Sequence, residues 1–108
     1  MSPSKVRLCR ADEVEAGSVK RFEPAGAAVA VALANRDGAL HAAVDNCSHE
    51  DYPLSEGEVF GDVCEIECVR HGSTFSLLDG APQSLPATKA IKILPIEVAD
   101  GDVWVELP

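Results

Sequence analysis

Apolar and polar residues alternate with a period of two along most of this chain, which is the pattern of half-buried β-strands. Near the N-terminus, Val6 to Arg10 and Val19 to Glu23 each predict a short strand. The polar residues 11–17 between them favour a short turn over a long helix. Pro24-Ala25-Gly26 follows with residues typical of turns.

The middle of the chain continues this pattern with one exception. Residues Val29 to Leu33 are small and apolar at every position, which is typical of a central strand or of one packed closely by a second sheet. Asn35-Arg36-Asp37-Gly38 predicts a hairpin turn. Leu40 to Asp45 then alternates again, and His41 falls on the face opposite the apolar side chains. We therefore expect His41 to be a solvated surface residue.

Further along, Glu58 to Phe60 and Val63 to Glu67 predict a hairpin that turns at Gly61-Asp62. Phe75 to Leu78 predicts another short strand. The proline-rich residues 81–87 cannot join a hydrogen-bonded ladder and are expected to form an ordered loop.

The last strands show a change of phase. Ile91 and Ile93 share one face, and Ile96 and Val98 continue that face after a shift at Pro95, where a bulge or an edge position is expected. Beyond the turn at Asp100-Gly101, the final strand places three apolar residues on one face and Trp104 on the other. These three are Val103, Val105 and Leu107.

Nine or ten short strands, frequent turns and no convincing helix predict an all-β protein, either a sandwich or stacked antiparallel sheets. The 108 residues suit one domain with a modest core. Hydrophobic residues make up 46% of the chain and charged residues 25%, a balance typical of globular proteins.

The charge balance narrows the choice of partners. Eighteen acidic residues against nine basic ones give a net charge of -9, which argues against nucleic acid or an anionic membrane and for a basic protein surface. No apolar run approaches the length of a membrane span. Residues 1–5 lack the apolar segment of a secretory signal, so we expect a cytoplasmic protein.

Two short motifs carry the chemistry. The first is Cys47-Ser48-His49 and the second is Cys68-Val69-Arg70-His71, and eighteen residues lie between them. Two thiolates and two imidazoles in converging loops would form a four-ligand metal site. Finger-type zinc sites usually group a Cys pair and a His pair. Here each segment supplies one Cys and one His, which suits a two-iron cluster with both thiolates on one iron and both imidazoles on the other. A mononuclear zinc site is the alternative.

With Gly72 after the second histidine, this signature resembles that of the bacterial Rieske-type ferredoxins, and the resemblance extends over nearly the whole chain. It implies a Rieske fold, in which an antiparallel β-sandwich base carries a small cluster-binding subdomain made by the two ligand loops. We expect a single domain over residues 1–108, with its cluster-binding part at about 46–76.

The resemblance also implies a Rieske-type [2Fe-2S] cluster, with thiolates on the inner iron and imidazoles on the outer one. The expected ligands are Cys47, His49, Cys68 and His71. Neutral imidazoles raise the reduction potential above that of an all-cysteine cluster. All four ligands come from the protein, so no open coordination position is left for catalysis.

Positions around the ligands adjust this expectation. Gly72 would let backbone amides approach a sulfide. Ser73 matches a hydroxyl donor of the high-potential respiratory Rieske proteins, with an ordinary turn residue as the alternative, whereas Phe75 stands where those proteins have a tyrosine. The disulfide that joins their two loops is also absent, so we expect a low or intermediate potential. Pro86 matches a loop that covers the cluster in the family, or is simply a surface turn.

Three further expectations concern side chains near these motifs. Tyr52, Leu54 and Phe75 are expected to shield the cluster from water, with plain core packing as the alternative. Cys64 alternates with glutamates and is interpreted as a small buried hydrophobe. Cys9 is out of phase with its apolar neighbours, which points to an exposed position. A disulfide between these two cysteines is not expected in a reducing cytosol.

Without a catalytic constellation, the chain alone should move electrons and not transform a substrate. The resemblance implies a soluble, monomeric one-electron carrier. It would take electrons from an NAD(P)H-dependent, flavin-containing ferredoxin reductase and pass them to a terminal non-haem iron oxygenase that hydroxylates aromatic rings. The alternatives are a non-catalytic Rieske-like subunit of another redox enzyme, such as nitrite reductase, and a zinc-stabilised binding module.

Overall fold

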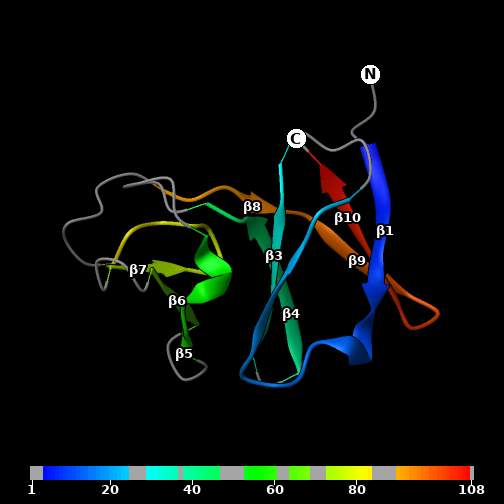
Figure 1. Cartoon of the computed structure of the whole chain (residues 1–108), viewed down its shortest axis with the longest axis horizontal. Coiled ribbons are helices and arrows are strands. Elements are labelled where there is room, and N and C mark those ends of the chain that lie inside the picture. The colour runs from blue at the N-terminus through cyan, green and yellow to red at the C-terminus, as the bar shows by residue number, and fades with distance from the viewer. Residues whose placement is uncertain are drawn as a thin grey trace.

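The part of the chain that the structure describes forms three antiparallel sheets that lie side by side, as the computed structural model in Figure 1 shows. The structure describes residues 4–24, 29–36, 38–46, 53–60, 64–68, 73–83 and 90–107. Within these ranges the only helical elements are two short 3-10 turns, η1 (Ala11–Glu13) and η2 (Leu54–Glu56). The prediction of an all-β fold is therefore confirmed.

The strands divide among the sheets as follows. Sheet A has the order β1 (Ser4–Arg10), β10 (Asp102–Leu107), β9 (Ile96–Ala99). Sheet B has the order β2 (Val19–Phe22), β3 (Val31–Arg36), β4 (Ala39–Val44), β8 (Ile93–Leu94). Sheet C has the order β5 (Val59–Phe60), β6 (Glu65–Cys68), β7 (Ser73–Ser76). We call sheets A and B the base. The described residues 53–60, 64–68 and 73–83, which contain η2 and sheet C, are called the cap.

Sheet B is the middle layer and is covered on both faces (Figure 1). On β3, Val31 and Leu33 face sheet A while Ala34 faces the cap. This confirms the central strand that the small apolar residues predicted, although it begins at Val31 and extends to Arg36. Small residues are needed here because a sheet on each side leaves little room between layers.

Two apolar cores result from this layering. The base core comprises Cys9, Val14, Val31, Leu33, Ala42, Leu94, Val103 and Val105. The cap core comprises Ala34, Ala43, Leu54, Cys64, Ile66, Cys68, Phe75, Leu77 and Ile91. Each core packs against one face of sheet B. The cap is therefore attached to the base through sheet B.

The hairpin predicted near residue 37 is confirmed, because Arg36 pairs with Ala39 and only two residues connect the strands. The second predicted hairpin is confirmed by the pairing of Phe60 with Glu65. The turns predicted at Gly61-Asp62 and at Ala25-Gly26 lie outside the described residues.

The prediction that Cys9 is exposed was wrong, since only 2% of this residue is accessible. The β1–β10 ladder contains an irregularity between Arg7 and Cys9, which shifts the alternation of the strand. Cys9 therefore enters the base core, and burial raises the pKa of its thiol.

The phase change at Pro95 marks a move from one sheet to another. The chain leaves sheet B after Leu94 and enters sheet A at Ile96. Pro95 lies at the corner, where no ladder hydrogen bond from its nitrogen is required. Val98 was expected to continue the buried face, but it lies on the edge strand β9 and is 51% exposed. In β10, by contrast, Val103 and Val105 are fully buried as predicted.

None of the helices within the described ranges is long and apolar enough to cross a membrane.

Candidate metal centre

The second ligand segment, which contains Cys68 and His71, begins at the last residue of strand β6. Cys68 is the last residue of β6 and pairs directly with Ser73, the first residue of β7. The four connecting residues, 69–72, include His71. Alternation along both strands places Ile66, Cys68 and Phe75 in the cap core, and Cys68 is completely buried. The hairpin ladder thus fixes the backbone of a buried thiol at the point where the connection starts.

The first ligand segment begins where β4 ends. The Val44 backbone N–H donates to the Lys92 carbonyl over 2.9 Å, and the Asp45 N–H donates to the Ala30 carbonyl over 2.9 Å. The last described backbone before Cys47 is therefore held on both sides. The chain is described again from Pro53, which leads into η2.

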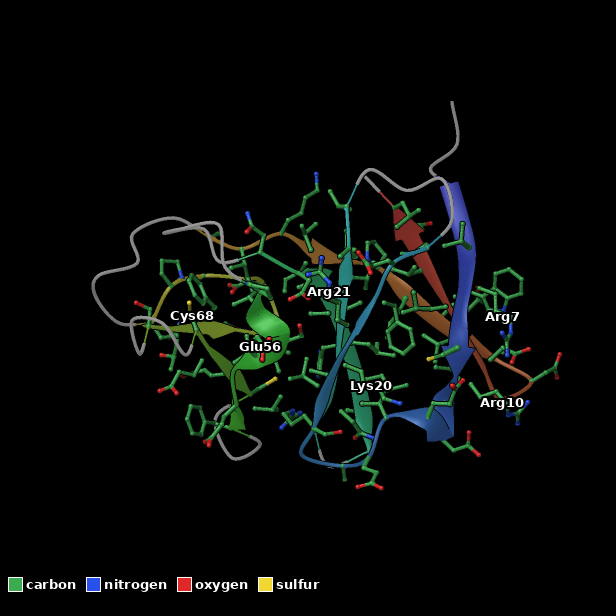
Figure 2. The ribbon with its side chains drawn as sticks, in the orientation of Figure 1. Arg7, Arg10, Lys20, Arg21, Glu56 and Cys68 are labelled. Carbon is green, nitrogen blue, oxygen red and sulfur yellow. The ribbon has the colours of Figure 1, made fainter. Side chains whose placement is uncertain are left out.

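The η2 turn lies against the strand that carries the second cysteine. Leu54 is fully buried in the cap core together with Cys68. A Cβ atom on Gly57 would overlap the backbone carbonyl of Glu67, so this contact needs glycine. The Glu67 N–H donates to the Glu58 carbonyl over 2.8 Å. The return from the first ligand segment is thereby attached to β6, as Figure 2 shows with Glu56 on η2 and Cys68 on the hairpin.

A carboxylate that the sequence analysis did not single out joins the two ends of the first ligand segment. The Asp45 carboxylate accepts hydrogen bonds from the Ser55 N–H (2.8 Å), the Ser55 hydroxyl (2.6 Å) and Arg21 Nη1 (2.9 Å). Its side chain has no exposed area. The hydrogen bond with Asp45 raises the pKa of the Arg21 guanidinium. In the sequence, the only sign of this role was that Asp45 is an acidic residue at the end of a predicted strand.

Of the residues expected at the site, the structure describes Cys68 and Ser73. Cys47, His49, His71, Gly72 and Pro86 lie outside the described residues, as does Tyr52. The ligand set therefore stays a prediction. Ser73 is fully buried within β7, so it is a strand residue and not the turn residue of the alternative interpretation. Leu54 and Phe75 are fully buried in the cap core, which fits plain core packing as well as shielding, so the shielding role stays a prediction.

Comparison with known proteins identifies the architecture. The Rieske [2Fe-2S] domain family matches residues 4–95. The chain belongs to this family. Ferredoxin CarAc of Metapseudomonas resinovorans is 35% identical over 100 residues, which cover 93% of this chain and 91% of the relative.

Solved structures agree with this membership of the Rieske family. The ferredoxin of carbazole 1,9a-dioxygenase from Nocardioides aromaticivorans IC177 superposes with a TM-score of 0.89 at 25% identity, covering 97% of this chain and 99% of that one. A chain in the complex of reduced oxygenase and oxidised ferredoxin of carbazole 1,9a-dioxygenase superposes with a TM-score of 0.87 at 30% identity, covering 97% and 94%. This Rieske protein is accordingly an electron-transfer component with a Rieske-type [2Fe-2S] cluster, and it is not catalytic alone.

The described residues fit a thiolate-bound cluster at this end of the cap. The buried Cys68 thiol is surrounded by apolar side chains of the cap core, which exclude water from one side of the centre. The described residues contain no group of three or more His, Cys, Asp or Glu side chains that could hold a metal, since the other expected ligands lie outside them. The part of the chain that the structure describes thus offers no competing site.

His41 differs from its predicted surface position. It is half-buried on the cap side of β4, with Nε2 3.9 Å from Cys64 Sγ. Burial, and then the nearby Arg36 charge, lower the pKa of His41. Cys64 is buried as predicted, but it precedes β6 in a left-handed conformation with φ of 55°. Cys9, Cys64 and Cys68, the cysteines that the structure describes, form no disulfide with one another.

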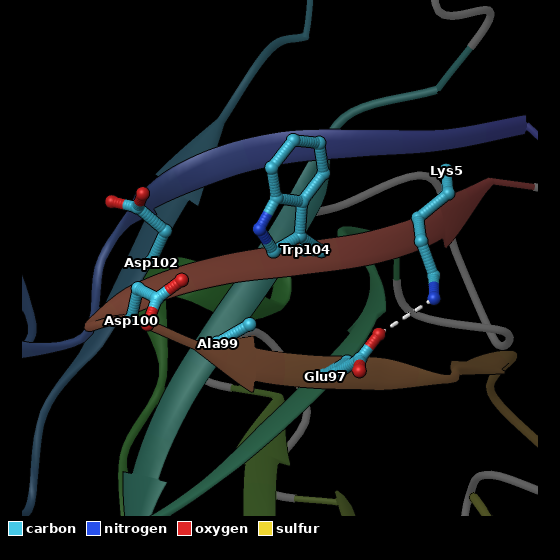
Figure 3. Close-up of a pocket in the computed structure, with 6 residues that line it drawn as sticks. All are labelled: Lys5, Glu97, Ala99, Asp100, Asp102 and Trp104. Carbon is cyan, nitrogen blue, oxygen red and sulfur yellow. Dashed lines mark hydrogen bonds and ion pairs between the residues drawn. The ribbon is translucent and has the colours of Figure 1, made fainter.

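An open hollow of about 420 Å³ lies on sheet A, in the base (Figure 3). It is lined by Lys5, Glu97, Ala99, Asp100, Asp102 and Trp104. Lys5 already pairs with Glu97 over 2.7 Å, and Arg7 pairs with Asp102 over 3.0 Å. Lys5, Glu97 and Asp102, which line the hollow, are thus already engaged in ion pairs.

Proposed function

We propose that this protein carries single electrons from an NAD(P)H-dependent flavoprotein ferredoxin reductase to a terminal non-haem iron oxygenase that hydroxylates aromatic rings. The observation that carries the proposal is similarity over almost the full length to ferredoxins whose names place them in dioxygenase systems. One similar chain comes from a complex of ferredoxin with oxygenase.

We propose Cys47 and Cys68 as ligands of the inner iron, and His49 and His71 as ligands of the outer iron. The position of Cys68 supports this, because its thiol is buried in the cap core while the connection that carries His71 continues beyond the ladder. When bound, such a cluster supplies reversible one-electron chemistry. Gly72, Ser73 and Pro86 are the proposed neighbours of the cluster, within a single domain over residues 1–108.

The charge of the cap supports a basic partner surface. Its described residues, 53–60, 64–68 and 73–83, include no lysine or arginine. They include Glu56, Glu58, Glu65, Glu67 and Asp79. A mostly acidic surface steers a partner of the opposite sign, although Arg70 adds one positive charge next to His71 in the sequence.

A low or intermediate reduction potential agrees with the described residues. Phe75 is fully buried in the cap core and has no hydroxyl to offer to the cluster. Hydrogen bonds to the sulfurs are one of the factors that raise such potentials. A monomeric state and a cytoplasmic location stay predictions from the sequence.

The decisive experiment is electron paramagnetic resonance on the dithionite-reduced protein, purified without added metal and analysed for iron, sulfide and zinc. We expect a rhombic spectrum with a low average g, the signature of a [2Fe-2S] centre with nitrogen ligands. Stoichiometric zinc without a signal would instead favour the zinc-stabilised module.

Substitution of the histidines tests the ligand assignment. His71→Cys replaces a neutral ligand by an anionic one, so any cluster that forms should have a lower reduction potential. His41→Asn is the matched control, since His41 lies outside both motifs. An unchanged spectrum and potential in His71→Cys would exclude His71 as a ligand.

Reconstitution with partners tests the function itself. The reduced protein should support turnover of a ring-hydroxylating oxygenase only when a flavoprotein reductase and NAD(P)H are present. Equal turnover with the ferredoxin omitted would contradict the carrier role.

A further inference from the structure

The first ligand segment, residues 46–54, contains Cys47 and His49. The Asp45 carboxylate before it is hydrogen-bonded to Ser55 after it. Burial of a charged carboxylate is costly unless hydrogen bonds replace its water. Asp45 receives three, two of them from Ser55 and one from Arg21. Residues 45 and 55 enclose the segment with Cys47 and His49, so these bonds close the segment at its base.

We propose that Asp45 is a positioning residue for the metal centre: by joining the end of β4 to η2, it holds the first ligand segment in the geometry that binds the cluster. The proposal rests on the proposed function, which assigns Cys47 and His49 as ligands. Closing a loop lowers the entropy that its residues lose when they become ordered. The bond from residue 45 to residue 55 therefore favours retention of the cluster.

The three partners have different tasks. Ser55 supplies two neutral donors from one residue, which fixes the orientation of η2 relative to β4. Arg21 lies on the edge strand β2 and supplies the opposite charge (Figure 2). The Arg21 side chain is 41% exposed, and its Nη2 also lies 3.6 Å from Glu23 Oε1. Arg21 balances the buried charge of Asp45, while Ser55 makes the connection between the two ends of the segment.

An amide cannot replace this carboxylate. In Asp45→Asn one acceptor oxygen becomes an NH₂ donor. If the remaining oxygen accepts from the Ser55 N–H, the new donor faces the Arg21 guanidinium, which is also a donor. At least one hydrogen bond is then lost in a buried place, where the cost is highest.

The test measures release of the cluster from the holoprotein. Visible absorbance is followed during incubation with excess EDTA for wild type, Asp45→Asn, Ser55→Ala and Ser55→Thr. Asp102→Asn is the matched control, because it makes the same change at an Arg–Asp pair in sheet A. We expect about tenfold faster release in Asp45→Asn, equivalent to about 1.4 kcal/mol, and release within twofold of wild type in the control. Ser55→Ala should release the cluster about threefold faster, and Ser55→Thr, which keeps the hydroxyl, should restore the wild-type rate.

Two further readouts separate positioning from general stability. The paramagnetic resonance spectrum of reduced Asp45→Asn should be shifted or broadened, whereas that of Asp102→Asn should equal the wild-type spectrum. Urea unfolding of all variants gives the global loss of stability. In a purely structural role, cluster release would follow this loss in every variant, whereas positioning predicts release faster than the loss accounts for.

Release from Asp45→Asn within twofold of the control would overturn the positioning role. If Asp45→Asn does not fold, Ser55→Ala decides, and a rate equal to that of Ser55→Thr would overturn it. Wild-type protein without an iron–sulfur signal would overturn the proposed function and the positioning role together. If the wild-type protein shows the iron–sulfur signal but the variants release their cluster at the wild-type rate, the positioning role alone is overturned.

Discussion

The base and the cap solve different physical problems. In the base, the β1–β10 ladder runs the length of both strands and is flanked by the Lys5–Glu97 and Arg7–Asp102 ion pairs. In the cap, the strands are two to four residues long, and its described residues contain no basic side chain. Strands that short are marginal alone and need a packed face.

The difference shows where each part obtains its order. The base is held by long-range pairing between its own strands, whereas the cap is held by packing on sheet B through the cap core and by η2. The ligand segments leave from elements of both parts, because β4 belongs to the base and β6 to the cap. A change in the packing between them should reach the cluster before it unfolds the protein.

The largest effect is expected from truncating each core. Phe75→Ala should lower the free energy of unfolding by about 3–5 kcal/mol, and Leu33→Ala by about 2–5 kcal/mol, because both side chains are fully buried. Only Phe75→Ala should also lower the iron content, since Phe75 shares the cap core with Cys68. Urea unfolding and iron analysis measure the two effects. Equal iron loss in both variants would erase the distinction between base and cap.

A smaller effect should follow from Gly57→Ala, whose new methyl group would overlap the Glu67 carbonyl. We expect a loss of about 1–3 kcal/mol and an altered resonance spectrum, because β6 must move to make room. Gly17→Ala is the control in the base: nothing lies near its Cβ, and only its φ of 83° is unfavourable, at about 1 kcal/mol. A wild-type spectrum in Gly57→Ala would show that this contact does not align the cap.

Charge reversal should affect partner binding by less. Glu58→Lys introduces a basic side chain on the exposed surface of the cap, and Glu15→Lys does the same on the base. At low ionic strength, we expect the proposed flavoprotein reductase to reduce Glu58→Lys about two- to fivefold more slowly than wild type, and Glu15→Lys at the wild-type rate. Added salt should remove the difference, because exposed charges are screened. Equal slowing in both variants would indicate an effect of net charge and not of the cap.

The smallest effect concerns pH. Burial lowers the pKa of His41, so the folded protein favours its neutral form. The stability that this provides is present above the ordinary pKa of 6.5 and is lost as the pH falls toward the lower folded value. Between about pH 7 and about pH 5, wild type should lose more unfolding free energy than His41→Gln. Urea unfolding across this pH range measures the free energy of unfolding of both proteins. If the two free energies change equally with pH, the burial of His41 between base and cap is contradicted.

The sequence alone determined the class of the protein. Alternation with a period of two located the strands, Asp37-Gly38 located a tight hairpin, and the C-x-H and C-x-x-H motifs indicated the family. These signals are local: each depends on residues that are neighbours in the chain. The same applies to the small apolar residues of β3, which indicated a strand covered on both faces before any partner was known.

The tertiary structure decided which positions are covered and which polar groups meet. Cys9 is buried through an irregularity in its ladder with β10, His41 is half-buried because the cap lies on β4, and Val98 is exposed because β9 is an edge. The contacts of Asp45 with Ser55 and Arg21 join segments that are 10 and 24 residues apart. No periodicity reports such contacts, because the alternation of a strand defines its two faces but not what another part of the chain places against them.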